Sequence, residues 1–209
     1  MNLIFMRHGE ATNNKEKLLS DKEIYWSILT EKGIKEVKDS INILPKSINR
    51  IYVSPLPRTI ETAHLVYKKY KATEVVIDNR LREINYGKYS GKKNNEELDN
   101  IRLKQIDGDY FIKFGDYGEN KFEIEFRLST FLKDISIENS KDSTILIISH
   151  GSITSYMKRV LTIKTPHIKT GKIESFTNVD FTSVFTHLDE LNKLEKGIKK
   201  EKEWSYELR

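Results

Sequence analysis

Two histidines of this chain follow short apolar runs and precede glycine, a pattern that can place reactive groups at the end of a strand. His8 comes directly after Arg7, and His150 comes after a second apolar run. A third apolar run ends shortly before Arg58. Such uninterrupted runs are typical of strands buried on both faces of a parallel sheet. Because open α/β folds bind ligands where the carboxyl ends of their strands meet, we expect two imidazoles and two guanidiniums to lie together.

A cluster of this kind suits a phosphoryl group. Clustered cations repel one another unless a multivalent anion lies among them. Arginine binds phosphate oxygens in bidentate fashion, and imidazole can donate to an oxygen or attack phosphorus. We expect His8 to attack as a neutral imidazole, with its other nitrogen held by a backbone carbonyl. Glu83 follows a further strand-like run, and bound phosphate would raise the pKa of its carboxyl, which suits a general acid and base.

Five ordered motifs extend this pattern along the chain. They are Arg7-His8-Gly9-Glu10 with Asn14, Ser54-Pro55-Leu56-Pro57-Arg58 with Thr62-Ala63, Leu81 to Gly91 with Glu83 and Gly87, Gly118-Glu119, and Ser149-His150-Gly151. Together they resemble the motifs of the histidine phosphatase superfamily, also called the phosphoglycerate mutase-like family, from residue 3 to about 185. The fourth motif departs from the family's Gly-Glu-Ser, because Asn120 replaces the serine. His167 and His187 lie outside the motifs and are expected to be structural or exposed.

The resemblance implies a role for each motif residue. His8 would be the nucleophile that carries a phosphohistidine, and Glu83 the acid and base. Ser20 aligns with a position that touches substrate in mutase-type members, and Tyr86 could pack under its loop or line the pocket. The residues implied to bind the phosphoryl group or the substrate are Arg7, Asn14, Ser20, Arg58, Tyr86 and His150. No metal or other cofactor is needed, because the protein's own cations neutralise the phosphoryl charge.

Phosphatases and mutases of this family share the first half-reaction and differ in whether water or a second substrate oxygen takes the phosphoryl group. Mutase-type members carry a longer insertion after the third motif, with a paired arginine. Here the insertion is shorter and has only Arg102 and Lys104, although Tyr86-Gly87 resembles the mutase version. We favour a phosphomonoesterase acting on a small-molecule phosphate ester. A 2,3-bisphosphoglycerate-dependent phosphoglycerate mutase is the first alternative, and a non-catalytic phospho-binding module is the second.

The surrounding pattern predicts the elements that position these residues. Strand-like runs at 3–6, 51–53 and 75–77 alternate with a helix capped by Thr30 and a helix from about residue 59. This β-α-β-α-β order predicts a three-layer α/β/α sandwich with a mostly parallel central sheet. Gly-rich residues 84–118 predict a small helical insertion over the active-site edge, with a helix near 95–105.

The second half of the chain continues in the same way. Residues 119–137 show helical spacing, 144–148 are the strongest strand, and a helix follows to about 161. Residues 181–187 predict an outer strand, and residues 203–208 are a candidate strand to pair with it. The charged residues between them fit a short helix or a loop. No linker interrupts the chain, so we expect residues 1–209 to form a single domain.

Composition limits the remaining classes of function. The chain has no cysteine, and its N-terminal apolar run is too short for a signal peptide or a membrane span, so we expect a cytoplasmic protein that does not insert into a membrane. The net charge is +5, but the sequence has no basic stripe interleaved with aromatic residues, the pattern that would indicate a nucleic-acid site. The sequence allows a homodimer, although it contains no coiled-coil heptad and no long exposed apolar helix face.

Overall fold

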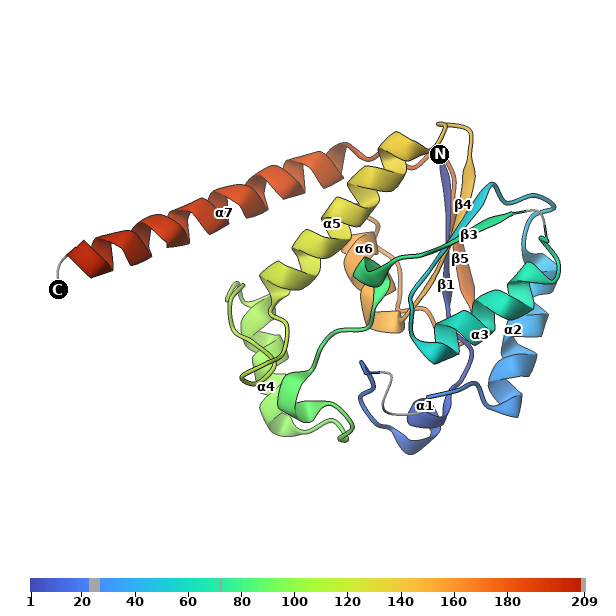
Figure 1. Ribbon diagram of the computed structural model, residues 1–209, viewed down its shortest axis with the longest axis horizontal. Helices are drawn as coiled ribbons and strands as arrows, with labels where there is room; N and C mark the ends of the chain where they lie inside the picture. The colour runs from blue at the N-terminus through green and yellow to red at the C-terminus, as the bar shows by residue number, and fades with distance from the viewer. Residues whose placement is uncertain (23–26, 72, 208–209) are drawn as a thin grey trace.

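A five-stranded sheet forms the centre of the structure, a computed structural model that describes residues 1–22, 27–71 and 73–207 (Figure 1). The strands are β1 (Asn2–Arg7), β2 (Arg50–Val53), β3 (Glu74–Ile77), β4 (Thr144–Ser149) and β5 (Ile173–Phe176). Their order is β3-β2-β4-β1-β5, and only β5 runs antiparallel to its neighbour. The expected mostly parallel central sheet is therefore confirmed.

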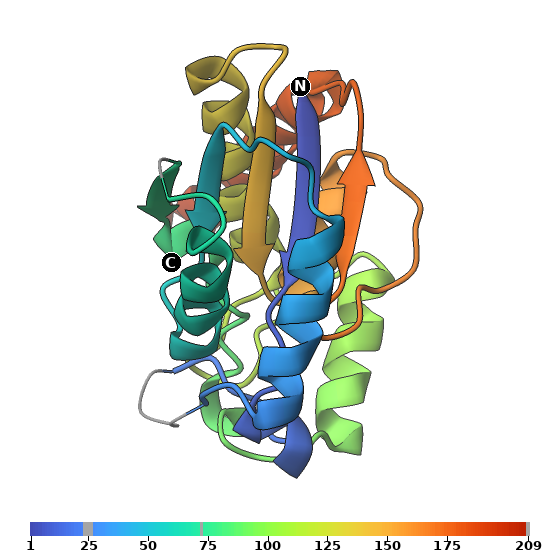
Figure 2. The same ribbon diagram turned by 90° about the vertical axis from the view of Figure 1, so that its right-hand side faces the viewer.

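Helices cover both faces of this sheet (Figures 1 and 2). The helices are α1 (Thr12–Glu16), α2 (Glu31–Ile43), α3 (Pro57–Tyr67), α4 (Glu96–Ile106), α5 (Lys121–Glu138), α6 (Gly151–Val160) and α7 (Thr182–Glu207). Helices α2 and α3 lie on one face, and α5 and α6 lie on the other (Figure 2). Thr30 caps α2 as expected, whereas α3 begins two residues early, because proline is well suited to a first helical position. Within the described residues, every helix is too short or too polar to cross a membrane.

Alternate residues of the central strands divide into two cores. Leu3 and Phe5 pack with Ile145 and Ile147 on the face covered by α5 and α6. Ile4, Met6, Leu146 and Ile148 pack on the face covered by α2 and α3. Both faces of these strands are therefore buried, which explains why their sequences are unbroken apolar runs rather than alternating apolar and polar residues.

The register of the strands brings their carboxyl ends together. In the β1–β4 pair Arg7 lies opposite Ser149, and in the β2–β4 pair Val53 lies opposite Ile148. Three neighbouring strands therefore end at the same level, and the residues that follow them emerge at one edge of the sheet. Both His-Gly pairs are delivered to this edge.

The insertion after β3 meets the loop after β1. It contains a 3₁₀ turn at Gly87–Tyr89 and α4, which is capped by Asn95, and a second 3₁₀ turn at Asn79–Leu81 precedes it. The N–H of Gly91 donates to the carbonyl of Leu19 at 2.7 Å, and the N–H of Leu19 donates to the carbonyl of Lys92 at 2.9 Å. These bonds join two segments that are distant in sequence, as expected for an insertion over the active-site edge.

The prediction for the last part of the chain was wrong. Residues 181–187 do not form an outer strand, because α7 begins at Thr182. Val184, Leu188 and Leu191 recur at helical spacing and are buried, and α7 packs on α5. The expected strand at 203–208 is helical as far as Glu207, and Leu208 lies outside the described residues. The outer strand is instead β5, and α7 extends away from the sheet (Figure 1).

The buried strands should dominate stability. Ile147 on β4 is fully buried, whereas Ile77 on the edge strand β3 is 61% exposed. We expect Ile147→Ala to lower the free energy of unfolding by about 2–5 kcal/mol, because it removes buried methyl groups and leaves a cavity. The matched change Ile77→Ala should cost about 0.5 kcal/mol or less. Urea denaturation of both variants measures the difference, and equal losses would contradict the layered core described here.

Candidate active site

His8 lies at the end of β1 and is 2% exposed. Its Nδ1 lies 2.7 Å from the carbonyl oxygen of Gly9, and its Nε2 accepts a hydrogen bond from Nε of Arg58 at 3.1 Å. A carbonyl can only accept and a guanidinium can only donate. Both contacts therefore place the imidazole proton on Nδ1 and leave the Nε2 lone pair available, which is the form that we expected for a nucleophile.

His150 follows β4 and is fully buried. Its Nδ1 lies 3.0 Å from Nη2 of Arg58, and its Nε2 lies 2.8 Å from Oγ of Ser54. Since Arg58 can only donate, the neutral ring carries its proton on Nε2 and donates it to Ser54. The ring centroids of His8 and His150 are 5.3 Å apart, so the two predicted histidines do face one shared place.

Both imidazoles are held in the neutral form. Burial lowers the pKa of His8 well below its ordinary value, and the charges of Arg58 and Arg7 lower it further. The pKa of His150 is also lowered well below its usual range, first by burial and then by Arg58. A neutral ring beside a guanidinium can act as acceptor or nucleophile without adding to the positive charge.

Arg58 connects the parts of this cluster. It lies in the first turn of α3 and is 1% exposed. In addition to its contacts with both imidazoles, its Nη2 donates to the carbonyl oxygen of Ser20 at 2.7 Å, and Nη1 lies 3.4 Å from Oγ of Ser20. Burial lowers the pKa of Arg58 to about 10, which still leaves it charged at neutral pH.

Arg7 approaches the cluster from β1. Its Nη1 donates to the carbonyl of Ile168 at 3.2 Å and lies 3.0 Å from Nε2 of His167. Its Nε is buried and has no hydrogen-bond partner among the described residues. A buried donor without a partner is costly, and Nε of Arg7 can therefore donate to a further acceptor.

Glu83 supplies the carboxyl group of the site. Burial raises its pKa, and the attraction of Arg58, the N–H of Ile84 and Arg7 offset this only in part. The charge of Glu83 in turn raises the pKa values of Arg7, Arg58 and Tyr86. A carboxyl with a raised pKa is more easily protonated than an ordinary one, so it can act both as a proton donor and as a proton acceptor.

The two remaining predicted residues have different surroundings. Asn14 uses Oδ1 to accept from the N–H of Ala11 at 3.0 Å, so this contact caps α1 and does not join Asn14 to the histidines. Tyr86 is 4% exposed, and its ring centroid lies 5.4 Å from that of Phe114. Burial, followed by the charge of Glu83, raises the pKa of Tyr86, which therefore keeps its proton.

Two residues with contacts to this cluster were not singled out from the sequence. Ser54 was noted only as part of a motif, yet its hydroxyl accepts the remaining proton of His150. Its position directly after β2 was the available signal. His167 was expected to be structural or exposed; it is exposed, but its ring also contacts Arg7. It lies in the loop between α6 and β5, and nothing in its local sequence indicates that contact.

Glycine is required where the loop after β1 turns. A Cβ on Gly9 would lie 2.3 Å from the carbonyl oxygen of Gly33, and a Cβ on Gly33 would lie 2.0 Å from the carbonyl oxygen of Glu10. Contacts of this length do not occur for real side chains. Two glycines therefore allow the backbone after His8 to lie directly against the first turn of α2, which holds the loop after His8 in place.

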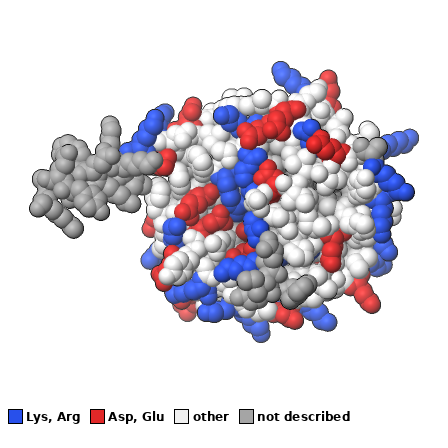
Figure 3. All heavy atoms as spheres, in the orientation of Figure 1, with Lys and Arg blue, Asp and Glu red and all other residues white. Residues whose placement is uncertain are grey.

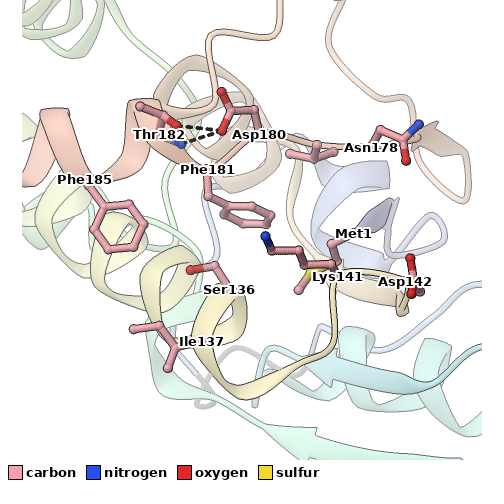
Figure 4. A pocket seen from close by; sticks show the side chains of 11 residues that line it. Met1, Ser136, Ile137, Lys141, Asp142, Asn178, Asp180, Phe181, Thr182 and Phe185 are labelled. Atoms are coloured by element: carbon pink, nitrogen blue, oxygen red, sulfur yellow. Dashed lines mark hydrogen bonds between the residues drawn. The ribbon is translucent and has the colours of Figure 1, made fainter.

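Other features of the surface lie away from this cluster. A cavity of about 610 Å³ lies at the opposite edge of the sheet, between Met1, the end of α5 and the start of α7 (Figure 4). It contains none of the predicted site residues.

Basic and acidic side chains alternate over the face in Figure 3, with a band of basic groups near its centre. No group of three or more histidine, aspartate or glutamate side chains in the described part of the chain could hold a metal ion.

The family model of the histidine phosphatase superfamily (branch 1) matches residues 3–193, which include every residue of the cluster. The chain belongs to this superfamily. A 2,3-bisphosphoglycerate-dependent phosphoglycerate mutase of Thermoplasma acidophilum is 36% identical over 106 residues, which cover 50% of this chain and 52% of the mutase. A bovine fructose-2,6-bisphosphatase is 34% identical over 94 residues, which cover 43% of this chain and 34% of that protein. The chain thus matches about half the length of the mutase and a third of the bisphosphatase.

Solved structures of this superfamily share the fold. The alpha-ribazole phosphatase of Shigella flexneri superimposes with a TM-score of 0.68 at 22% identity, over 84% of this chain and 89% of that one. A mycobacterial glucosyl-3-phosphoglycerate phosphatase superimposes with a TM-score of 0.69 at 18% identity, over 83% and 91% of the two chains. The α/β/α architecture is therefore that of histidine phosphatases, and the named relatives include both mutases and phosphatases.

The neutral imidazoles predict an acid-sensitive fold. The pKa of His150 is lower in the folded chain than in the unfolded chain, so below pH ~6.5 the unfolded chain binds more protons. The stability is thus present above that pH and is lost as the pH falls. We expect each such histidine to remove up to about 1.4 kcal/mol per pH unit between pH ~6.5 and 5.

Urea unfolding at pH 7.5, 6 and 5 tests this expectation. His150→Gln should show a smaller loss of stability on acidification than the wild type. His64→Gln, at an exposed position on α3, is the matched control and should follow the wild type. A His150→Gln variant that loses stability in parallel with the wild type would show that His150 is not held neutral by its surroundings.

Proposed function

We propose that this protein is a phosphomonoesterase that forms a phosphohistidine on His8 and hydrolyses it with water. The observation that carries this proposal is the convergence of two neutral, buried imidazoles with two guanidiniums and one carboxyl group of raised pKa. Arg7 and Arg58 together carry two positive charges, which match a phosphomonoester dianion. Membership of the superfamily supports the same chemistry at a coarser level, as a phosphoryl-transfer enzyme.

The first step transfers the phosphoryl group to the protein. The Nε2 lone pair of His8 attacks phosphorus, the bond between phosphorus and the ester oxygen breaks, and the carboxyl of Glu83 gives its proton to the departing oxygen. In the structure Nε of Arg58 donates to this lone pair at 3.1 Å. The phosphoryl group must take the place of that donor, and Arg58 can then donate to phosphoryl oxygens instead.

The second step returns the protein to its first state. Water attacks phosphorus, the carboxylate of Glu83 takes a proton from that water, and the bond between phosphorus and His8 breaks. Orthophosphate then leaves. A dianion between the rings would also raise the pKa of His150, which could then donate a proton from Nδ1 toward a phosphoryl oxygen.

A basic pocket beside the cluster supports a small anionic ester as the substrate. This cavity of about 160 Å³ lies between the insertion, the start of α5 and α6. Among the residues that line it are three cations and three hydroxyl groups, namely Arg102, Lys121, Arg159, Tyr86, Ser152 and Tyr156. Tyr86 relates the two regions, because it lines this cavity and the charge of Glu83 raises the pKa of its hydroxyl. We propose that the alcohol part of the ester carries a second acidic group that enters this pocket.

The lack of cysteine supports a cytoplasmic location for such an enzyme.

The test is a screen of phosphorylated metabolites, with and without a second acidic group, in the absence of added metal. Release of phosphate that disappears in His8→Ala and survives a chelator supports the proposal. Activity that survives His8→Ala would refute the phosphohistidine step. Binding of orthophosphate without turnover of any ester would instead favour a non-catalytic phospho-binding module.

The mutase relative justifies a second assay. The protein is supplied with 3-phosphoglycerate and 2,3-bisphosphoglycerate, and isomerisation is compared with phosphate release. The insertion has a single arginine, Arg102, where mutase-type members carry a pair. We therefore expect hydrolysis to be faster. Isomerisation that far outpaces phosphate release would make the protein a mutase.

The proton-donor role of Glu83 gives a sharper prediction. Glu83→Gln should lower kcat by about 10²–10⁴-fold for an alkyl phosphate, whose leaving oxygen needs a proton. The loss should be much smaller for p-nitrophenyl phosphate, because p-nitrophenolate leaves without one. Glu97→Gln on α4 is the control, since that carboxylate is exposed and pairs with Lys88. Equal losses for both substrates would contradict the role of Glu83 as the acid.

A further inference from the structure

His167 lies in the loop between α6 and β5 and contacts one of the two guanidiniums of the site. Its Nε2 lies 3.0 Å from Nη1 of Arg7, and its Nδ1 lies 3.1 Å from Oγ of Ser155 on α6. Oγ of Ser155 in turn donates to the carbonyl oxygen of Gly151 at 3.0 Å. A chain of contacts therefore runs from the residue after His150 through Ser155 and His167 to Arg7.

The direction of each hydrogen bond in this chain is determined. Arg7 can only donate, so Nε2 of His167 must be an acceptor and the neutral ring must carry its proton on Nδ1. That proton needs an acceptor, which is Oγ of Ser155. The single hydroxyl proton of Ser155 goes to the Gly151 carbonyl, so its oxygen is free to accept. Every donor thus meets an acceptor only when His167 is neutral.

Packing holds the imidazole against Arg7 as well. A Cβ on Gly151 would lie 2.4 Å from both Cε1 and Nε2 of His167 and 3.1 Å from Cζ of Arg7. The ring and the guanidinium thus occupy the space above this glycine. Arg7 has one further acceptor on the same loop, the carbonyl of Ile168 at 3.2 Å.

We propose that His167 is a positioning residue which, as the neutral Nδ1–H tautomer, holds Arg7 in the orientation that binds a phosphoryl group. This inference rests on the proposed function of Arg7. With Nη1 committed to the loop, the unpartnered Nε of Arg7 stays aligned for an acceptor. His167 is exposed and makes no contact with the nucleophile itself, so it acts on the reaction through Arg7.

Protonation of His167 should release this contact. A protonated ring would present a donor, and a second positive charge, to Arg7. The charged groups that face His167 are Arg7 from β1, Lys158 from α6 and Glu174 from β5. Burial, Arg7 and Lys158 lower the pKa of His167, and Glu174 raises it only in part. The contact should therefore persist to below pH ~6.5 and fail in more acidic solution.

The experiment measures the affinity for orthophosphate by calorimetry, and kcat/KM where an ester is turned over, from pH 7.5 to 5. His167→Ala should weaken both by about tenfold at pH 7.5, as expected for loss of one charge-assisted hydrogen bond. His167→Gln places an amide oxygen near the position of Nε2 and should retain most of the affinity, without the extra loss at acidic pH. His64→Ala on α3 is the matched control and should behave as the wild type.

Three results would overturn the inference. The first is a His167→Ala variant equal to the wild type at pH 7.5. The second is a His167→Gln variant as weak as His167→Ala, which would mean that the ring merely fills space. The third comes from nitrogen NMR of the imidazole, which needs neither substrate nor turnover. The inference requires that wild-type His167 carries its proton on Nδ1 and that Arg7→Ala raises the pKa of His167. A proton on Nε2, or an unchanged pKa in Arg7→Ala, would overturn it.

This design separates two failures. If the wild type binds no phosphate and hydrolyses no ester, the proposed function fails, and the NMR measurement still decides whether His167 is the acceptor for Arg7. If the wild type is active but the His167 variants are unaffected, the positioning role fails and the phosphatase assignment stands.

Discussion

The structure depends on one guanidinium that is shared between two buried imidazoles. Arg58 is almost fully enclosed and donates to His8 through Nε and to His150 through Nη2. A buried cation is tolerated only if acceptors surround it, and an imidazole accepts only when it is neutral. The contacts of Arg58 therefore determine both tautomers, and the remaining proton of each ring goes to Gly9 or to Ser54.

The same pairing of a neutral imidazole with a guanidinium also occurs at the margin of the cluster. His167 is a third imidazole placed beside a guanidinium, and its second nitrogen is again satisfied by a hydroxyl group, that of Ser155. Three neutral rings thus let two cations approach one place without adding positive charge. Glu83 is the only carboxyl that we assign to this place, and its raised pKa is the counterpart of the lowered pKa values of the imidazoles. Such an arrangement favours a dianion electrostatically, because the neutral rings orient the cations without neutralising them.

The fold supplies this geometry through strand register rather than through loops. Strands β2, β4 and β1 are adjacent and parallel, so the residues after them emerge at one level. The loops are then held by close backbone contacts, such as that of Gly9 with Gly33, and by the bonds between Leu19 and the insertion. Sites on rigid elements keep their groups in position more precisely than sites on free loops.

The sequence by itself determined the parallel strands, most helices and the grouping of His8, Arg58 and His150. Unbroken apolar runs and strand ends are local signals, and Arg-His-Gly and Ser-His-Gly are local motifs. Only the tertiary structure decided that residues 173–176 form the outer strand and that a helix begins at Thr182, because the burial of Val184 and Leu188 depends on α5. It also decided that Asn14 caps α1 and that His167 reaches Arg7. These contacts join residues whose pairing leaves no trace in local spacing, since it depends on which acceptors three-dimensional packing brings within reach of each donor.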